Sequence, residues 1–353
     1  MIANIRRAMR GLGADAVLLT GERNRRYAAG FHSTAGVAYI SEKRAVFFTD
    51  FRYIEAARAT IQGFDVREPA KGTSYAAVVN ALIADDHVKT IALEDDTLTF
   101  AEFTRWQDSL TAKTVPMNGM MNRLRMVKTE AELQNIVAAQ RIAERAFLEV
   151  LGDIRPGATE KQIAAKLTYL MLLYGAENMS FDPIVVSGAN SSRPHGVPGD
   201  KPVAEGDFVT MDFGCIVNGY CSDMTRTVAV GYATDEMAAV YDIVLRAQKA
   251  GIAAARPGAT GAAIDKAGRD LIEAAGYGDC FGHGFGHGVG LFIHEEPTAS
   301  PRWDRPLDEG VVLTAEPGIY LPGKFGVRIE DMLYLTGGSC RNLTEAPKEL
   351  MIL

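Results

Sequence analysis

Cysteine is scarce in this chain of 353 residues. No two of its four cysteines have the CxxC spacing, so the sequence indicates neither a zinc knuckle nor a disulfide framework. We expect buried free thiols, because an unpaired cysteine behaves as a small apolar side chain. The four residues are Cys215, Cys221, Cys280 and Cys340.

Long apolar runs and an excess of positive charge are also absent. No segment approaches the roughly 18 consecutive apolar residues that a membrane-spanning helix needs, and residues 1–7 are not followed by the apolar stretch of a signal peptide. The net charge of −7 and the isoelectric point near 5.5 argue against nucleic acid or an anionic membrane as the main partner. We expect a cytoplasmic protein.

The stretch 282–297 contains three of the six histidines and five glycines. Because glycine weakens helix and strand interiors, these glycines indicate a close approach of the backbone. A dinucleotide-binding loop is excluded by the glycine spacing, and the helical zinc-protease motif fails because Thr298 stands where its second histidine would be. If the stretch is extended, His283 and His287 lie ~13 Å apart and cannot bind one ion.

The length predicts two domains. Helical and extended patterns alternate in the first part of the chain, which predicts a small α/β domain. A boundary is expected at 113–122, where Pro116, Asn118 and Gly119 interrupt the pattern. We therefore divide the chain into 1–122 and 123–353. Strands are expected at 16–19, 36–40, 44–49 and 90–93, and helices at 4–13, 53–62 and 74–84.

An internal repeat organises the second domain, which opens with a predicted helix capped by Thr129 and Glu132. The five-residue string Arg-Pro-Gly-Ala-Thr occurs twice, and two ten-residue segments also match. The pairs are 155–159 with 256–260 and 205–214 with 309–318. We predict an α+β domain of two copies related by a pseudo-twofold axis. Asp212 and Glu316 occupy corresponding places in it.

The sequence Val-Asn-Gly-Tyr at 217–220 predicts a two-residue hairpin turn. Counting back from this turn pairs Asp212 with Thr225. Asp212 and Asp223 then lie diagonally on one face of the hairpin, because residues two apart on a strand share a face. Two carboxylates this close repel each other unless a cation lies between them.

A second acid pair, Glu316 and Glu330, lies in the other copy. We expect Glu316 on one strand and Glu330 on a strand spanning 327–335, with a longer loop at 318–326 between them. Arg328 shares a face with Glu330 by strand alternation, so it could orient the carboxylates without binding the metal itself.

Together with His287, the four acids form a set that suits two divalent ions, manganese, cobalt or zinc. Each residue alone has an ordinary alternative. An acid in a hairpin is usually solvated, Glu330 and Asp331 could be a surface pair, and His294 could form an exposed ion pair with its glutamate neighbours. The repeat that aligns acid with acid favours the metal site.

These segments resemble the pita-bread metallopeptidases, in particular the branch of Xaa-Pro dipeptidases (prolidases) and aminopeptidase P. The resemblance covers essentially the whole chain. It is carried by 26–31 and 49–53 in the first domain, and by 187–196, 211–214, 222–227, 282–294, 314–318 and 328–331 in the second. It implies a creatinase-like N-terminal domain at 1–122 and a pita-bread catalytic domain at 123–353.

The resemblance also implies a dinuclear metal site with every ligand position filled, which separates the chain from creatinase and from chaperone-type relatives. The implied ligands are Asp212, Asp223 and Glu330 for one ion, and Asp223, His287, Glu316 and Glu330 for the other. The implied catalytic residues are His195, His283, His294 and Glu316, and the implied substrate-binding residues are His195, His294 and Arg328. Mn²⁺ or Co²⁺ is expected, and Zn²⁺ is possible.

The chemistry expected from this site is metal-assisted amide hydrolysis, in which cations lower the pKa of a water molecule. Glu316 would relay the proton to the leaving nitrogen. His195 and His294 would donate hydrogen bonds to the substrate carbonyl, each contributing ~3 kcal/mol.

Small peptides with proline in second position as substrates, and a homodimer, are implied by the resemblance alone. A dipeptidase must bind the free carboxylate on the product side, for which Arg193 is a candidate, whereas an aminopeptidase must leave that side open. Another hydrolase or lyase on the same scaffold, and a vestigial peptide-binding protein without activity, are the further alternatives.

Overall fold

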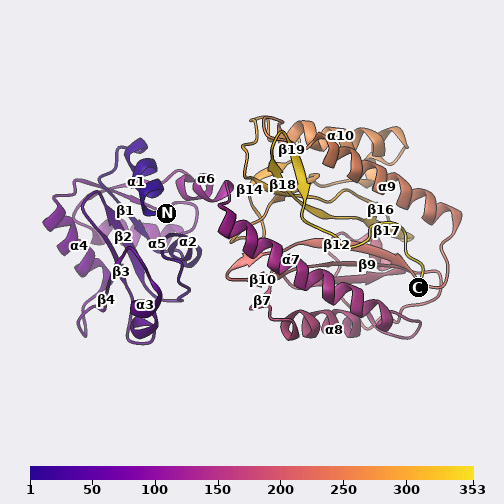
Figure 1. Ribbon diagram of the computed structural model, residues 1–353, viewed down its shortest axis with the longest axis horizontal. Helices are drawn as coiled ribbons and strands as arrows, with labels where there is room; N and C mark the ends of the chain where they lie inside the picture. Colours follow the sequence, from indigo (N-terminus) through magenta and orange to yellow (C-terminus); the bar gives the residue numbers. More distant parts are fainter. The chain divides into compact units, whose positions relative to one another are not determined.

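The computed structural model describes residues 1–353. The chain divides into two compact units, Met1–Arg125 and Met126–Leu353 (Figure 1). The division falls at the end of helix α6 (Met120–Met126). None of the helices is long and apolar enough to cross a membrane.

The first unit is built on one mixed sheet. Its strands are β1 (Ala16–Leu19), β2 (Val37–Ser41), β3 (Ala45–Phe48), β4 (Asp65–Arg67), β5 (Thr90–Leu93) and β6 (Lys113–Pro116), and its helices are α1 (Ile2–Gly11), α2 (Glu22–Ala29), α3 (Ile54–Thr60), α4 (Tyr75–Asp86) and α5 (Phe100–Ser109). The strand order is β4-β3-β2-β1-β5-β6, with β1 antiparallel to β2 and parallel to β5. This confirms the predicted α/β class. Helices α2 and α5 and strands β4 and β6 were not expected from the sequence.

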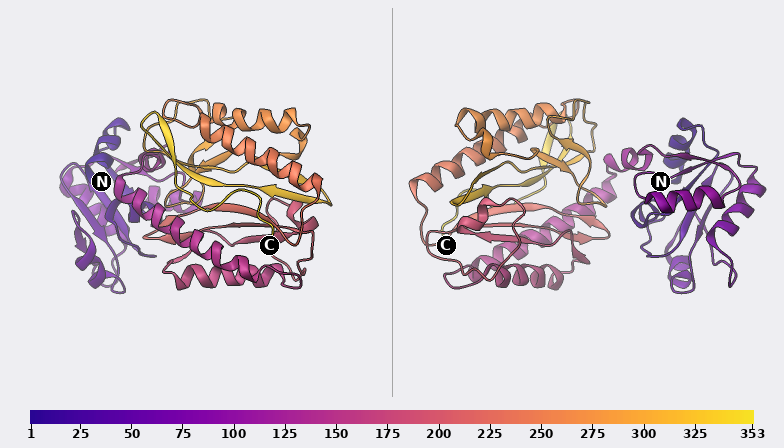
Figure 2. Two further views of the ribbon diagram at one scale, coloured as in Figure 1. Left: turned by 45° about the vertical axis from the view of Figure 1, so that its right-hand side comes forward. Right: turned by 180° about the vertical axis from the view of Figure 1, so that it is seen from behind.

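The second unit consists of two similar halves. The first contains α7 (Glu130–Val150), α8 (Glu160–Leu173), β7 (Asn178–Met179), β8 (Ile184–Ser187), β9 (Phe208–Phe213), β10 (Cys215–Val217), β11 (Tyr220–Cys221) and β12 (Met224–Ala229). The second contains α9 (Asp235–Ala254), α10 (Gly261–Ala274), β13 (Gly286–Gly288), β14 (Glu295–Ala299), β15 (Val312–Ala315), β16 (Gly318–Leu321), β17 (Phe325–Arg328), β18 (Asp331–Thr336) and β19 (Ser339–Asn342). In both views of Figure 2 the strands of this unit lie between the helix pair α7 and α8 and the helix pair α9 and α10.

Matching contacts confirm the internal repeat. Thr159 caps α8 and Thr260 caps α10, each accepting a hydrogen bond from a backbone N–H in the first turn of its helix. The glycine of each repeated string donates its N–H across the loop, Gly157 to Val203 O at 2.9 Å and Gly258 to Leu307 O at 2.8 Å. The two copies therefore share their local hydrogen bonding as well as their sequence.

The predicted hairpin register is also confirmed. Asn218 and Gly219 both have positive φ values, 49° and 82°, as a type I′ turn requires. Val217 pairs with Tyr220, and Asp212 on β9 pairs with Thr225 on β12.

The prediction for 318–335 was wrong in two respects. Residues 318–326 do not form a loop, because β16 and β17 pair as a hairpin with Gly318 opposite Arg328. The expected strand at 327–335 is interrupted: β17 ends at Arg328 and β18, which pairs with β15, begins at Asp331. Glu330 therefore lies at a bend between two sheets.

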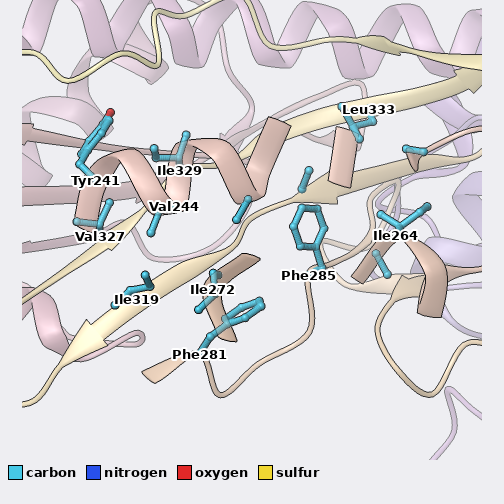
Figure 3. Close-up of a cluster of buried hydrophobic side chains, with 14 of the residues drawn as sticks. Tyr241, Val244, Ile264, Ile272, Phe281, Phe285, Ile319, Val327, Ile329 and Leu333 are labelled. Carbon is cyan, nitrogen blue, oxygen red and sulfur yellow. The ribbon is translucent and has the colours of Figure 1, made fainter. Parts of the chain in front are cut away.

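Phe285 packs in the buried cluster of the second copy, together with Tyr241, Val244 and Ile264 (Figure 3). Two helix glycines make room for its ring. A Cβ added at Gly251 on α9 would lie 2.1 Å from the ring, and one added at Gly268 on α10 would lie 2.2 Å from it. The ring thus fixes the start of β13 against both helices.

All four cysteines are free, as expected. Cys215 and Cys221 are buried, but Cys280 and Cys340 are only partly buried, so the expectation of burial was wrong for these two.

Candidate metal centre

Four acids and one histidine from both copies converge in the second unit. Asp212 lies on β9, and Asp223 immediately precedes β12. In the other copy His287 is the central residue of β13, Glu316 follows β15, and Glu330 precedes β18. Each side chain is placed at a strand or just beyond a strand end, where neighbouring backbone fixes its position.

Three of these residues offer ligand atoms that all lie within 4.8 Å of one another: Asp223, His287 and Glu330. His287 Nε2 is 3.5 Å from Asp223 Oδ2 and 3.2 Å from Glu316 Oε1. The ring presents this nitrogen to the acids because Nδ1 lies 3.1 Å from Gly288 O and donates to it.

The electrostatics of the cluster are those of a site made for a cation. Burial first, and then the neighbouring carboxylates, raise the pKa of Asp223 and of Glu330 well above the ordinary range. Asp212 Oδ1 and Glu330 Oε1 are buried without a hydrogen-bond partner. Unpaired carboxylate oxygens packed this closely are the ligands that hard divalent ions take, so the residues fit such ions.

Glu316 behaves differently from the other acids. Burial alone would raise its pKa, but the hydrogen bond and charge of His287, with His283 and Arg328, outweigh it and lower the pKa to about 2. Its Oε1 also accepts from Thr314 Oγ1 at 3.0 Å. Glu316 is therefore a carboxylate at neutral pH.

Arg328 holds several parts of the site together and is almost wholly buried. Its Nη2 donates to Asp212 Oδ2 at 2.6 Å, and its Nη1 donates to Tyr320 OH at 2.9 Å. Its Nε donates to Thr225 Oγ1 at 3.1 Å, and that hydroxyl donates to Glu330 Oε2 at 2.7 Å. The guanidinium thus contacts one acid directly and a second through a threonine.

A cavity of about 280 Å³ opens beside the acids. Four of the six histidines line it, together with Asp212, Glu316, Tyr320, Arg328 and the hydroxyl residues Thr298 and Ser300. The histidines are His195, His283, His287 and His294. The cavity thus brings carboxylates, imidazoles and hydroxyl groups together.

The three predicted non-ligand histidines differ in their surroundings. His283 Nε2 lies 2.9 Å from Tyr320 OH, and its burial lowers its pKa. The ring of His294 packs edge-on against the ring of His287 with centroids 4.3 Å apart. His195 is exposed on the loop after η2 (Gly188–Ser192). His283 and His287 therefore face different partners.

One ordinary alternative from the sequence is wrong. Glu330 and Asp331 are not a surface pair, because both are buried and Asp331 pairs with Arg226 at 2.8 Å. Glu295 forms a buried ion pair with Lys128 at 2.7 Å, whereas His294 faces the cavity. Arg193 is exposed and is not among the cavity-lining residues.

Tyr320, Thr298 and Ser300 line the cavity and were not predicted from the sequence. Tyr320 was missed because it lies in the segment taken for a loop. The pattern Gly-Ile-Tyr-Leu and Phe-Gly-Val-Arg around Pro322 and Gly323 could have indicated the hairpin.

The model of metallopeptidase family M24 matches residues 134–337. The chain belongs to this family. The model of the creatinase/prolidase N-terminal domain matches residues 1–127. This M24 metallopeptidase therefore has both domains that its sequence resembles, and its family membership implies that divalent metal takes part.

Similar proteins cover nearly the full length of the chain. The uncharacterized peptidase YqhT of Bacillus subtilis is 41% identical over 97% of both chains. The structure of an Xaa-Pro dipeptidase from Bacillus anthracis has a TM-score of 0.96 and 43% identity, covering 100% of this chain and 99% of that one. The structure of an X-Pro aminopeptidase from Thermotoga maritima has a TM-score of 0.93 and 41% identity, covering 98% and 100%.

Proposed function

We propose that this M24 metallopeptidase hydrolyses the peptide bond that precedes proline, in dipeptides or at the N-termini of longer peptides. The observation that carries the proposal is the grouping of Asp223, His287 and Glu330, with Glu316 Oε1 3.2 Å from His287 Nε2, beside a cavity lined by Asp212 and four histidines. The two similar structures, an Xaa-Pro dipeptidase and an X-Pro aminopeptidase, support the proline preference.

The proposed cofactor is a pair of divalent ions, Mn²⁺ or Co²⁺, with Zn²⁺ as the alternative. Asp212, Asp223 and Glu330 would hold one ion, and Asp223, His287, Glu316 and Glu330 the other. The unpaired oxygens of Asp212 and Glu330 support this assignment. Bound there, the ions would supply Lewis-acid activation of water and of the scissile carbonyl.

The side chains of this protein would supply the proton transfers and the orientation. Glu316, ionised at neutral pH, would accept a proton and pass it to the leaving nitrogen. His294 and His195 line the cavity and would donate hydrogen bonds to the substrate carbonyl as negative charge develops on it. Tyr320 and Arg328 would keep His283 and Asp212 in place.

The cavity also bears on the choice between dipeptides and longer peptides. Arg328 is the one lysine or arginine that lines it, and its guanidinium is committed to Asp212 and Tyr320. A dipeptide carries its free carboxylate close to the cleaved bond and needs a cationic partner there. A longer peptide carries that charge farther away, so we expect a tripeptide to be cleaved at least as well as the dipeptide.

Hydrolysis of Ala-Pro, Met-Ala and Ala-Pro-Ala tests the proposal. Metal-stripped protein would be assayed with and without Mn²⁺ or Co²⁺. We expect metal-dependent release of alanine from the two proline peptides and none from Met-Ala. Silence on all three peptides despite bound metal would point to another hydrolase or lyase reaction, and failure to bind metal would point to a vestigial peptide-binding protein.

We further expect a homodimer that resides in the cytoplasm and binds neither nucleic acid nor membrane. Light scattering of the purified protein would measure the subunit number, and cell fractionation would measure the location.

A further inference from the structure

Glu160 is a fully buried carboxylate that the proposed reaction does not use. It is the first residue of α8, directly after the cap Thr159. It touches none of the proposed metal ligands. A polar side chain is rarely buried without hydrogen-bond partners, so the partners of Glu160 indicate its task.

Those partners are the two ends of one loop. Glu160 Oε1 accepts from Ser187 N at 2.7 Å, from Ser187 Oγ at 2.9 Å and from Asn190 Nδ2 at 3.1 Å. Its Oε2 accepts from Gly199 N at 2.9 Å. One carboxylate therefore fastens the beginning and the end of the segment 187–199.

A lysine completes the anchor from the other side. Lys201 Nζ donates to Ser187 Oγ at 2.9 Å and forms an ion pair with Asp207 at 2.7 Å. The Ser187 hydroxyl thus accepts from a cation while it donates to Glu160. Charge-assisted bonds of this kind are stronger than neutral ones.

The middle of this loop is a wall of the active-site cavity. Pro194 and His195 line the cavity, and Pro194 O accepts from Arg328 Nη1 at 3.3 Å. His195 itself is exposed. Its position therefore depends on the backbone of a loop that Glu160 ties at both ends.

The second copy of the repeat shows that the helix does not need this acid. The residue that corresponds to Glu160 is Gly261, where an added Cβ would lie 2.0 Å from Thr298 O. Helix α10 still begins after a capping threonine, as α8 does. The carboxylate thus serves the loop of the first copy and not the repeated fold.

We propose that Glu160 is a positioning residue that holds the loop 187–199, and through it His195, in the geometry that binds substrate. This inference rests on the proposed function for the role of His195. The position of His195, a proposed substrate-binding residue, would then depend on Glu160, which does not line the cavity.

The test uses the full-length, Mn²⁺-loaded protein and the variants Glu160→Gln, His195→Ala and the double variant. The amide of Glu160→Gln keeps the volume but turns one acceptor into a donor that faces N–H groups. We expect Glu160→Gln to lower kcat/KM for Ala-Pro-Ala on the order of a hundredfold, as displaced catalytic groups do, with metal content unchanged. The double variant should be no less active than His195→Ala, because residues that act through one another are not additive.

Gln162→Ala is the matched control, because Gln162 belongs to the capping box of the same helix and its side chain accepts from Thr159 N at 2.9 Å. It should leave kcat/KM within about twofold of the wild type. A Glu160→Gln variant with wild-type kcat/KM, or losses that multiply in the double variant, would overturn the proposal.

Hydrogen exchange separates this inference from the proposed function. Amides at 188–199 should exchange faster in Glu160→Gln than in the wild type and remain unchanged in Gln162→Ala. Unchanged amide exchange at 188–199 in Glu160→Gln would contradict the positioning role, whether or not the peptides are cleaved. A wild-type protein that cleaves none of them would overturn the proposed function alone.

Discussion

Asp223 and Glu330 are buried close to each other, and burial and the repulsion of neighbouring carboxylates both disfavour their charged forms. At the residue scale, the buried acids therefore lower the stability of the metal-free protein. A bound cation removes this repulsion, and so does the loss of one of the charges.

The variant Asp223→Asn separates these two effects. We expect it to lose the thermal stabilisation by Mn²⁺, which is about 2.7 kcal/mol when the metal is present at about 100 times its Kd. Without metal it should unfold no earlier than the metal-free wild type, because a neutral amide of nearly the same size replaces a carboxyl group whose ionisation is disfavoured there. Differential scanning fluorimetry with and without Mn²⁺ measures both, and Asp242→Asn on the exposed face of α9 is the control. A variant that keeps the full Mn²⁺ shift would show that Asp223 is not a ligand.

Cys215 offers a second prediction at this scale. Its thiol is fully buried and donates to Ala139 O at 3.2 Å, and burial is the main cause that raises its pKa to about 12. We expect the native protein to leave Cys215 unlabelled by a thiolate-specific reagent at about pH 9, where an unfolded thiol is largely ionised. Mass spectrometry of labelled peptides, with urea-unfolded protein as the control, measures this; equal labelling rates in both states would contradict it.

The raised pKa of Cys215 also makes the free energy of unfolding depend on pH. Because the folded pKa lies above the unfolded value, the contribution of Cys215 is fully present below about pH 8.5 and declines as the pH rises toward 12.

Individual residues were predictable where a local rule fixed them. The Asn-Gly turn set the register that pairs Asp212 with Thr225, because such a turn admits few geometries. Tyr320 followed no local rule, since its partners are Arg328 and His283, brought to it by tertiary folding.

At the scale of elements, the ring of Phe285 determines how β13 meets α9 and α10. Phe285 directly precedes Gly286 and His287 in the chain. Phe285 N donates to Asp265 Oδ1 at 3.0 Å, and Phe285 O accepts from Glu316 N at 2.8 Å. One residue therefore links helix packing to two of the proposed ligands.

Gly268→Ala should destabilise the protein by about 1–3 kcal/mol, the usual cost of overpacking. Alanine favours a helix by up to about 1 kcal/mol over glycine, but its methyl would lie 2.2 Å from the Phe285 ring and 3.0 Å from Ala247 O. The steric clash should therefore outweigh the gain in helix propensity, so the variant should be less stable than the wild type. Urea unfolding measures the difference, and Gly282→Ala, where nothing lies within 4 Å, is the control. A more stable Gly268→Ala protein would show that the ring can move aside.

Helix α7 was found from the sequence, whereas α2 and α5 were missed, although α5 begins with a capping box of its own formed by Thr99 and Glu102. The capping box of Thr129 and Glu132 marked the start of α7 correctly. Helix α2 was missed because its inner face carries a buried arginine, Arg25, whose Nη2 donates to Ser33 O at 2.6 Å. A charged side chain on the core face conceals the apolar period on which prediction depends.

At the scale of the whole molecule, the two copies supply different proposed ligands to one site. Asp212 and Asp223 come from the first copy, and His287, Glu316 and Glu330 from the second. Ions bound between them would link halves of the unit that are far apart in sequence.

Adding Mn²⁺ to the metal-free protein should therefore slow hydrogen exchange in both 208–230 and 312–336. Strands β1, β2 and β3 of the first unit serve as the internal control and should exchange as before. Protection confined to one copy would show that the ions are not shared.

The overall architecture was largely predictable because the repeated string contains a glycine at a position whose backbone conformation favours glycine. Gly157 and Gly258 have φ values of 94° and 83°, which glycine adopts readily and other residues do not. The break between β17 and β18 was not predictable, since it depends on two sheets meeting at Glu330.

The repeat also has a consequence for ancestry. A homodimer of a single copy would already have brought the same acid from each of two chains to its twofold axis, at the places now held by Asp212 and Glu316. One acidic residue in one short gene would then have been enough to create a pair. If duplication and fusion then joined the copies, each half would have been free to specialise, and Glu160 and Gly261, which differ at corresponding positions of the two copies, fit such a divergence.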